Sequence, residues 1–326
     1  MSNGKILVTG GTGFIGSNLA KALLAKGYEV RCFVRKSSKT GFLENLGAEI
    51  FYGDIVDKFS LQNALKDITV VFHLAGILGK WGVSPKVYNE IHVGGTATIV
   101  ETCIEQGVRR FIYCSTSGVL GPIHDPPANE TRPYNPSNVY EYAKTEAEKL
   151  VLNHRKELDV TIIRPGLVYG PRDMHTLSLF KSIKNRQFFI IGDGKALLHP
   201  TYIEDLNQGF VLCLKNKKSI GEVYLVVGEK YVAVNEFLNV VSRTLGLKAS
   251  WIHVPTCIAN VLAGVAELAG KVLRFEPPLT YSRVKFFTEN RAFSYSKIEQ
   301  DLGYKPVKLE EGIKKTVNWY KRCGYL

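Results

Sequence analysis

Two residues that can move a proton stand four positions apart in this chain, Tyr140 and Lys144. A tyrosine hydroxyl has a pKa of about 10 in water, too high for a good base near neutral pH. Residues four apart share a helix face, so the Lys144 ammonium is expected to stabilise the phenolate and lower that pKa. Tyr142 faces away on the same helix. The spacing predicts a tyrosine acid/base, with an ordinary surface pair as the alternative.

Hydroxyl side chains close a buried strand upstream of this pair, in the run Ser115, Thr116 and Ser117. Ligands of open α/β sheets bind beyond the carboxyl ends of the strands. A hydroxyl at this point can orient a substrate oxygen. The others are then helix caps or turn formers, since all three cannot be catalytic.

A glycine-rich turn, TGGTGFIG at residues 9–16, follows the apolar run 6–8 and precedes a helical pattern. Gly10 allows the tight bend, Gly13 lets the backbone approach a pyrophosphate, and Gly16 lets the helix pack closely on the strand. The helix N-terminus adds free N–H groups and a partial positive charge. The turn therefore predicts a dinucleotide site made of Gly10, Thr12, Gly13, Phe14, Ile15 and Gly16.

The end of the second candidate strand distinguishes the two nicotinamide cofactors. An acidic residue there would bond the adenosine ribose and repel a 2′-phosphate. Here Arg35, Lys36 and Ser37 follow the strand, and no carboxylate occurs from residue 30 to 43. Arg35 can stack on adenine or fork onto phosphate oxygens. These residues favour NADP(H), with NAD(H) as the alternative if they are ordinary solvated cations.

Apolar, β-rich runs alternate with helical patterns through the first half of the chain. Continuous apolar runs suit strands buried on both faces of a parallel sheet, and the alternation predicts an α/β fold with a doubly wound parallel Rossmann sheet. The expected strands are Lys5–Thr9, Glu29–Val34, Glu49–Tyr52, Val70–Leu74, Arg109–Ser115 and Thr161–Arg164. The expected helices are Ile15–Lys26, Leu61–Leu65, Val87–Gln106 and Ser137–Arg155.

After Pro165 the rhythm changes, and helical patterns dominate from Val234 onward. We expect a dinucleotide-binding domain at 1–165 and a smaller, mainly helical C-terminal substrate lobe at 166–197 and 229–326. Tyr202–Leu214 and Val223–Val227 look like a return to the sheet, so 198–228 is assigned back to the first domain.

Composition and charge narrow the kinds of partner that this chain is expected to bind. The net charge is +12, but the lysines are dispersed and no aromatic–basic stacking motif occurs, which argues against a nucleic-acid binder. Six scattered cysteines with no metal-ligand spacing indicate a reduced cytoplasmic protein without a metal. The apolar stretch Cys257–Leu273 contains Glu267 and Lys271, so we expect it to be too short and too charged to span a membrane. Core packing, a cap over an apolar pocket and peripheral membrane contact remain as its explanations.

Taken together, these pieces resemble the extended short-chain dehydrogenase/reductase superfamily, the NAD-dependent epimerase/dehydratase family, over nearly the whole chain. The C-terminal part, from the segment 275–280 to the segment 302–306, is similar to that of the branch containing 3β-hydroxysteroid dehydrogenases and dihydroflavonol reductases. The matching segments are 9–16, Gly53-Asp54, 73–76, CSTSGVLG at 114–121, the Tyr140/Lys144 pair, 164–171 and 202–206.

The resemblance implies further contacts. Thr116 aligns with the catalytic hydroxyl, with Ser115 as the fallback. A homodimer is implied, through a four-helix bundle of 87–106 and 137–155. The cofactor is implied to meet Asp54 and Ile55 at adenine, Leu74, Ala75 and Gly76 along its length, and Pro165 and Val168 at the nicotinamide.

Departures from the family pattern narrow the reaction. Ser117 stands where dehydratases carry the first residue of an Asp-Glu pair, which argues against dehydration. Leu198 replaces an arginine by which epimerases clamp a sugar diphosphate, although Lys195 and Arg172 can compensate. In the resemblance, His92 stands where an asparagine normally braces the active site. We expect a satisfied buried histidine there, with a substitute donor or a titrating group as the alternatives. The candidate substrate positions are Ser117, His92, Tyr169, Arg172 and Leu198.

The sequence thus predicts an NADP(H)-dependent oxidoreductase that interconverts a ketone and a secondary alcohol on an apolar small molecule. The alternative is a nucleotide-sugar epimerase using the same Tyr/Lys/Thr centre. A second alternative, a non-catalytic NADP(H) sensor, is disfavoured because such proteins commonly lack the Tyr/Lys pair.

Overall fold

The computed structural model describes residues 4–79 and 81–326. Its centre is a seven-stranded sheet in the order β11-β6-β5-β4-β1-β2-β3, and every pairing in it is parallel. All six expected strands are present, with ends within two residues of those predicted. The sheet contains β1 (Lys5–Thr9), β2 (Val30–Val34), β3 (Glu49–Tyr52), β4 (Ile68–His73), β5 (Arg110–Cys114), β6 (Asp159–Pro165) and β11 (Val223–Val226).

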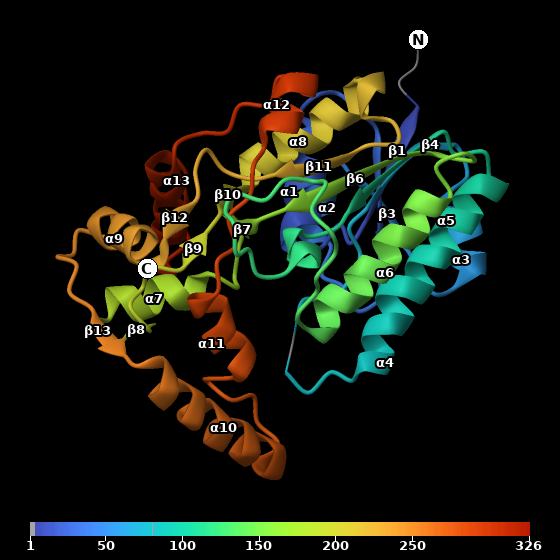
Figure 1. The fold of residues 1–326 in the computed structure, drawn as a ribbon. Coiled ribbons are helices and arrows are strands. Elements are labelled where there is room, and N and C mark those ends of the chain that lie inside the picture. The colour runs from blue at the N-terminus through green and yellow to red at the C-terminus, as the bar shows by residue number, and fades with distance from the viewer. Residues whose placement is uncertain (1–3, 80) are drawn as a thin grey trace.

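Helices cover both faces of the sheet, as the doubly wound prediction requires (Figure 1). Successive residues of β1 point to opposite sides, because side chains alternate along a strand. Ile6 and Val8 join the apolar core shared with α1 (Phe14–Leu24) and α8 (Ile203–Lys215). Leu7 joins the core shared with the helices of the other face, α3 (Lys58–Ala64), α5 (Gly95–Glu105) and α6 (Val139–Asn153).

The expected helix over 87–106 is divided. It begins as α4 (Pro85–Tyr88), passes through a π-helical segment at Asn89–Gly94 and continues as α5. π-helical turns are rare and are frequent at functional sites. This one carries His92.

The chain returns to the sheet after residue 198. Residues 202–214 form the end of a short strand and then α8, while Val223–Val226 becomes the edge strand beside β6. Short strand pairs make up much of the remainder: β7 (Leu167–Tyr169) with β10 (Pro200–Tyr202), β9 (Leu197–Leu198) with β12 (Val232–Ala233), and β8 (Phe189–Ile191) with β13 (Ile252–Val254).

Helices dominate the C-terminal part, as expected. They are α9 (Val234–Thr244), α10 (Thr256–Leu273), α11 (Tyr281–Thr288), α12 (Ser296–Leu302) and α13 (Leu309–Arg322), with the earlier α2 (Gly41–Asn45) and α7 (Leu177–Lys184). The short α2 was not predicted from the sequence.

The helix α10 corrects one sequence expectation. It has 18 residues with a mean hydropathy of 1.4, which is long and apolar enough to cross a membrane by length and composition. Only 17% of that segment is buried, so core packing does not explain its apolar residues either. Figure 1 shows α10 at the outer end of the molecule, with α11 between it and the rest.

Candidate active site

The carboxyl ends of the central strands meet at one edge of the sheet. The last residues of β1 and β4, Thr9 and His73, are paired, and Tyr113 of β5 lies opposite His73. The run Ser115–Ser117 begins directly beyond β5. The structure therefore brings the glycine turn after β1 and the hydroxyl run after β5 to the same edge, where ligands of such sheets bind.

Tyr140 is the second residue of α6, whose N-cap is Asn138 with its side chain accepting from the Glu141 amide at 3.0 Å. Burial of the Tyr140 hydroxyl raises its pKa, and the neighbouring Thr116 side chain lowers that pKa by less. The His92 ring meets the Tyr140 ring edge-on, with centroids 5.5 Å apart. The predicted acid/base thus has a hydroxyl partner and aromatic walls.

Lys144 is buried one turn further along α6. Its ammonium donates to the carbonyl oxygen of Cys114 at 2.6 Å and lies 4.1 Å from the centre of the Tyr113 ring. Burial lowers the pKa of Lys144 from 10.5 to about 8. The expected lowering of the Tyr140 pKa by Lys144 is absent from this structure, because the ammonium is turned toward the end of β5 and burial of the phenol outweighs the charges around it.

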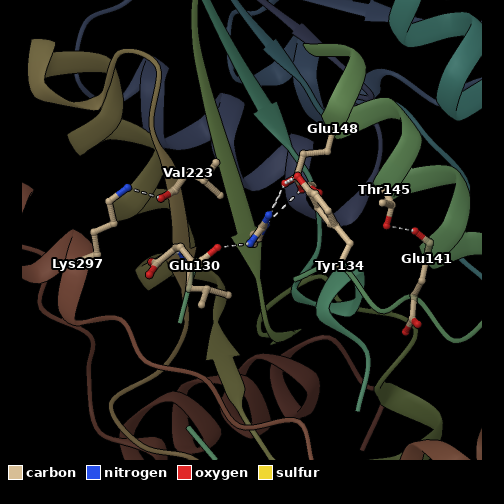
Figure 2. Close-up of polar contacts among 10 residues, drawn as sticks. Glu130, Tyr134, Glu141, Thr145, Glu148, Val223 and Lys297 are labelled. Carbon is tan, nitrogen blue, oxygen red and sulfur yellow. Dashed lines mark hydrogen bonds and ion pairs between the residues drawn. The ribbon is translucent and has the colours of Figure 1, made fainter. Parts of the chain in front are cut away.

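Ser115 and Thr116 have separate roles in the geometry. The Ser115 hydroxyl donates to Glu148, a completely buried carboxylate. The Tyr134 hydroxyl donates to the same carboxylate at 2.9 Å and Arg164 Nη2 at 2.6 Å (Figure 2). Ser115 is therefore held by a structural cluster, which leaves Thr116 as the hydroxyl beside the acid/base.

The glycine turn has the shape that a pyrophosphate needs. Gly10 has a φ of 69°, and a Cβ at Gly16 would lie 2.2 Å from the Gly10 carbonyl oxygen. The N-cap residue of α1, Gly13, is exposed and makes no side-chain cap, so the first N–H groups of the helix are left for a ligand. Thr12, Phe14 and Ile15 are partly exposed in the same turn.

A buried network behind this turn was missed by sequence reasoning. Thr9 Oγ1 accepts from the Leu74 and Ala75 amides, both at 3.1 Å, so its own proton goes to His73 Nδ1 at 2.8 Å. His73 Nε2 lies 3.1 Å from Thr96 Oγ1, and burial lowers the pKa of His73 to about 3. The neutral imidazole links the ends of β1 and β4, where the segment that is predicted to line the cofactor, 74–76, begins. The only sequence signal was two polar residues at strand ends.

The cationic corner predicted for a 2′-phosphate lies at the end of β2. Arg35, Lys36 and Ser37 are exposed, and neither cation forms an ion pair within residues 4–79 and 81–326. The neighbouring strand β3 leads to Asp54, which is exposed, and to Ile55, which is buried. The two groups of predicted adenosine contacts therefore stand at adjacent strand ends.

His92 lies at the site and differs from the expected satisfied histidine. Its Nε2 is 2.9 Å from the Ile77 carbonyl oxygen, whereas its buried Nδ1 has no hydrogen-bond partner in the part of the chain described. Burial lowers the pKa of His92 to about 4, so the ring is neutral and Nδ1 is an acceptor. A Cβ at Gly76 would lie 2.5 Å from the ring, so the glycine makes room for it.

The remaining candidate positions are divided between the site edge and other places. Ser117 is buried in the turn directly after Thr116, Pro165 ends β6, and Val168 is half-buried in β7. Tyr169 and Leu198 are instead buried in the apolar core between the sheet and the second lobe. Core packing is the reason that we omit these two from the proposed substrate site.

Arg172 lies beside the first helix. Its guanidinium stacks at 3.4 Å from the centre of the Phe42 ring, and its Nε is 3.4 Å from Ser17 Oγ in α1. These contacts hold the guanidinium against α1 and α2, and the substrate role of Arg172 stays a prediction.

Sequence reasoning also missed an ion pair between the C-terminal lobe and the start of α6. Arg291 Nη1 donates to Glu141 at 2.9 Å, and its Nη2 lies 3.4 Å from Ser137 Oγ. The partners are 150 residues apart, and no local pattern signals such a contact. The ion pair fixes the helix end that carries Tyr140.

A parallel sheet of this strand order, with a glycine turn at its first helix and a Tyr/Lys pair beyond its strand ends, defines an NAD(P)-binding α/β enzyme. The chain belongs to the NAD dependent epimerase/dehydratase family, whose model matches residues 6–228. It is an extended short-chain dehydrogenase/reductase of the 3β-hydroxysteroid dehydrogenase-like branch.

Two curated relatives are oxidoreductases by name. The chain is 31% identical to 3beta-hydroxysteroid-dehydrogenase/decarboxylase isoform 1 of Arabidopsis thaliana, over 93% of this chain and 72% of the relative. It is 28% identical to 2-alkyl-3-oxoalkanoate reductase of Shewanella oneidensis, over 94% of this chain and 84% of the relative.

Solved structures extend the comparison. The crystal structure of gox2253 is similar with a TM-score of 0.85 and 28% identity, covering 99% of this chain and 100% of the other. The UDP-glucuronic acid 4-epimerase from Bacillus cereus, in complex with UDP-glucuronic acid and NAD, is similar with a TM-score of 0.79 and 28% identity. The match covers 98% of this chain and 99% of that chain. The similar proteins thus include both oxidoreductases and sugar-nucleotide epimerases.

Proposed function

We propose that the protein is an NADP(H)-dependent oxidoreductase that interconverts a ketone and a secondary alcohol on a largely apolar substrate. The observation that carries the proposal is that Thr116, directly beyond β5, meets Tyr140 and Lys144 of α6 at the carboxyl edge of the sheet. The two oxidoreductase relatives, named for a hydroxysteroid and an alkyl-oxoalkanoate, support a hydroxyl or keto group on an apolar skeleton.

In this mechanism a bound nicotinamide supplies the hydride for reduction and accepts it in oxidation. Tyr140 holds its proton because burial raises the pKa of the phenol, so it is ready to protonate the carbonyl oxygen as the alcohol forms. Thr116 donates to the same substrate oxygen and orients it. Lys144 is held by the Cys114 carbonyl one turn further along α6, and its ammonium would donate hydrogen bonds to the nicotinamide ribose and so position the cofactor beside Tyr140. Oxidation of the alcohol follows the same path in reverse.

The cofactor preference rests on the exposed corner after β2. Two cations without an ion pair in the described chain and one hydroxyl offer charge-assisted bonds to a 2′-phosphate, whereas a carboxylate there would repel it. Arg35, Lys36 and Ser37 are the proposed contacts. The adenine side is assigned to Asp54 and Ile55.

A nucleotide-sugar epimerase is the second candidate, and the fold similarity to the UDP-glucuronic acid epimerase favours it. The identity of residue 198 argues against it. Leu198 is 2% exposed and packed in apolar core, so the position that would hold a diphosphate-binding arginine offers no charge. The sensor alternative is disfavoured by the assembled Tyr140–Thr116 pair.

One set of variants separates these functions. Tyr140→Phe removes the acid/base, and Tyr142→Phe, two residues away and 58% exposed, is the matched control. With NADPH and a panel of aliphatic and steroid ketones, we expect loss of nicotinamide absorbance for the wild type and for Tyr142→Phe. Tyr140→Phe should be slower by about 10²–10⁴-fold. Interconversion of UDP-sugars without net change in absorbance would assign the epimerase, and NADPH binding without turnover of either substrate class would assign the sensor.

Three further expectations from the sequence remain proposals. The domain division is 1–165 with 198–228, against 166–197 with 229–326. The homodimer pairs α5 and α6 with those of a second copy, and the exposed Val139 and Tyr142 on α6 suit such a contact. The cytoplasmic location rests on six free cysteines. Light scattering at several concentrations tests the dimer.

A further inference from the structure

The helix α10 presents a continuous apolar face to the outside of the molecule. Seven large apolar side chains on it are between 50% and 72% exposed. Their spacing of three and four residues makes one stripe along the helix. They are Ile258, Val261, Leu262, Val265, Leu268, Val272 and Leu273.

The opposite face of α10 is made of small residues that pack against α11. Ala259 and Ala263 are fully buried and form one apolar cluster with Val284. A Cβ at Gly264 would lie 2.7 Å from the Tyr281 hydroxyl, and one at Gly270 would lie 2.7 Å from Pro277. A helix that folds only for its own core buries its large apolar side chains, and α10 does the reverse.

The charges beside this face are positive. Glu267, the one carboxylate in the helix, accepts from the Tyr281 amide at 2.9 Å. Glu276 in the following loop is paired with Arg283 at 2.9 Å. Lys271 and Arg274 are exposed and form no ion pair with any described residue. The apolar stripe is thus bordered by free cations at its C-terminal end, which complements an anionic surface.

We propose that α10 docks the protein on an anionic lipid bilayer, lying flat at the level of the headgroups with its apolar stripe against the acyl chains. Such a position satisfies the apolar stripe and brings Lys271 and Arg274 to the lipid phosphates. The helix lies on the bilayer and does not cross it, because a crossing would remove its small-residue face from α11 and its Glu267 from the Tyr281 amide.

The segment that follows α10 and α11 connects the proposed membrane face to the catalytic edge. Just after α11, Arg291 bonds Glu141, the neighbour of Tyr140, and the Ile123 amide donates to the Asn290 carbonyl at 2.8 Å. If the proposed function is right, this arrangement lets an apolar substrate enter from the lipid. The docking itself does not depend on the reaction, so the two proposals fail separately.

The test measures binding of the full chain to vesicles by flotation. Phosphatidylcholine vesicles and equimolar phosphatidylcholine–phosphatidylserine vesicles are the probes. We expect wild type to float with the anionic vesicles and to be released as salt is raised. The double variant Val265→Glu/Leu268→Glu should lose at least about tenfold in partitioning, since two charges enter the acyl boundary. Phe59→Glu on α3, where the native side chain is 73% exposed, is the matched control and should bind like wild type.

Two further measurements remove ambiguity. Lys271→Gln/Arg274→Gln should weaken binding to the anionic vesicles by about fivefold for each charge, which is ~1 kcal/mol per basic residue. A polarity-sensitive fluorophore on Cys257, the exposed cysteine of α10, should shift to the blue with vesicles, with Cys323→Ser removing the other exposed thiol.

Three results would overturn the proposal. They are failure of wild type to bind either vesicle, equal binding of wild type and Val265→Glu/Leu268→Glu, and a lipid-free dimer that the double variant dissociates. The last outcome would assign the face to a second copy of this chain. Unchanged circular dichroism of the variants confirms that they fold.

Discussion

The most demanding test of the site's framework is the buried carboxylate of Glu148. Its side chain is 0% exposed, and its partner Arg164 is 4% exposed. Arg164 donates to it through Nε at 3.0 Å and Nη2 at 2.6 Å, and the hydroxyls of Tyr134 and Ser115 donate as well. Ser115 joins this cluster to Thr116, the next residue in the chain.

Glu148→Gln keeps the shape and removes the charge. The guanidinium of Arg164 is then left buried without its anion, and the new amide N–H groups face side chains that were all donating. Removal of one partner of a buried ion pair costs about 3–5 kcal/mol, and we expect the free energy of unfolding to fall by that amount. This is a large share of the ~5–15 kcal/mol that holds a typical domain folded.

The matched control is Glu146→Gln, two residues earlier on α6. Its pair with Lys149 is 2.8 Å long but the side chains are 57% and 48% exposed. Solvent screens such a pair, so the loss should stay below ~1 kcal/mol. Urea unfolding, followed by far-UV circular dichroism, gives the free energy of unfolding of both variants. The two values are comparable when the slope of that free energy against urea concentration is the same. A loss in Glu148→Gln no larger than that in Glu146→Gln would refute the reasoning. If Glu148→Gln does not fold, Glu148→Leu/Arg164→Met tests the same idea, because replacing both charges should recover most of the loss.

Further predictions concern the cofactor, the pH profile and the unpaired histidine. Arg35→Asp should lower the ratio of kcat/KM for NADPH to kcat/KM for NADH by about 10–100-fold, because it removes one charge-assisted bond and adds a like charge. Lys26→Asp, in the exposed turn after α1, should leave that ratio unchanged. An unaltered ratio in Arg35→Asp would remove Arg35 from the site. Because the pKa of Lys144 is lowered to about 8, its ammonium is present below pH 8 and lost above it, so kcat/KM should fall as pH rises through 8. Between pH 8 and 10.5 the unfolded chain binds more protons at Lys144 than the folded chain, so this residue should make the free energy of unfolding rise with pH in that range. Lys144→Met should abolish the pH dependence of kcat/KM and that of the free energy of unfolding, measured in rate profiles and by urea unfolding. His92→Phe keeps the ring beside Tyr140 but removes the free Nδ1 acceptor, and kcat/KM should drop by about tenfold if that atom bonds a substrate or an ordered water; an unchanged value assigns the histidine to packing alone.

The sequence by itself determined the elements that depend on local pattern. The apolar run of β1, the glycine turn and α1 are continuous in the chain, so strand period, turn chemistry and helix start could be predicted together. The same holds for Tyr140 and Lys144, whose shared helix face follows from their spacing. Strand–helix alternation was enough to predict the doubly wound sheet, because few topologies accommodate it.

Only the tertiary structure decided which polar groups meet. Thr9, His73 and Thr96 come from three separate segments, and Arg291 reaches Glu141 across 150 residues. No local period encodes such contacts, because they depend on how whole elements pack. The direction of the Tyr140 pKa shift was also decided by the tertiary structure. The spacing predicted a neighbouring charge, but the burial that raises the pKa depends on packing.

The same limit explains the two corrections on apolar residues. Tyr169 and Leu198 look like site residues by position in the sequence, yet they lie in the core because the second lobe packs over them. For α10, composition shows an apolar helix but not which way it faces. The fit of Ala259 and Ala263 against α11 turns the large side chains outward. Burial is a property of the partner surface, and the sequence of one element does not contain that surface.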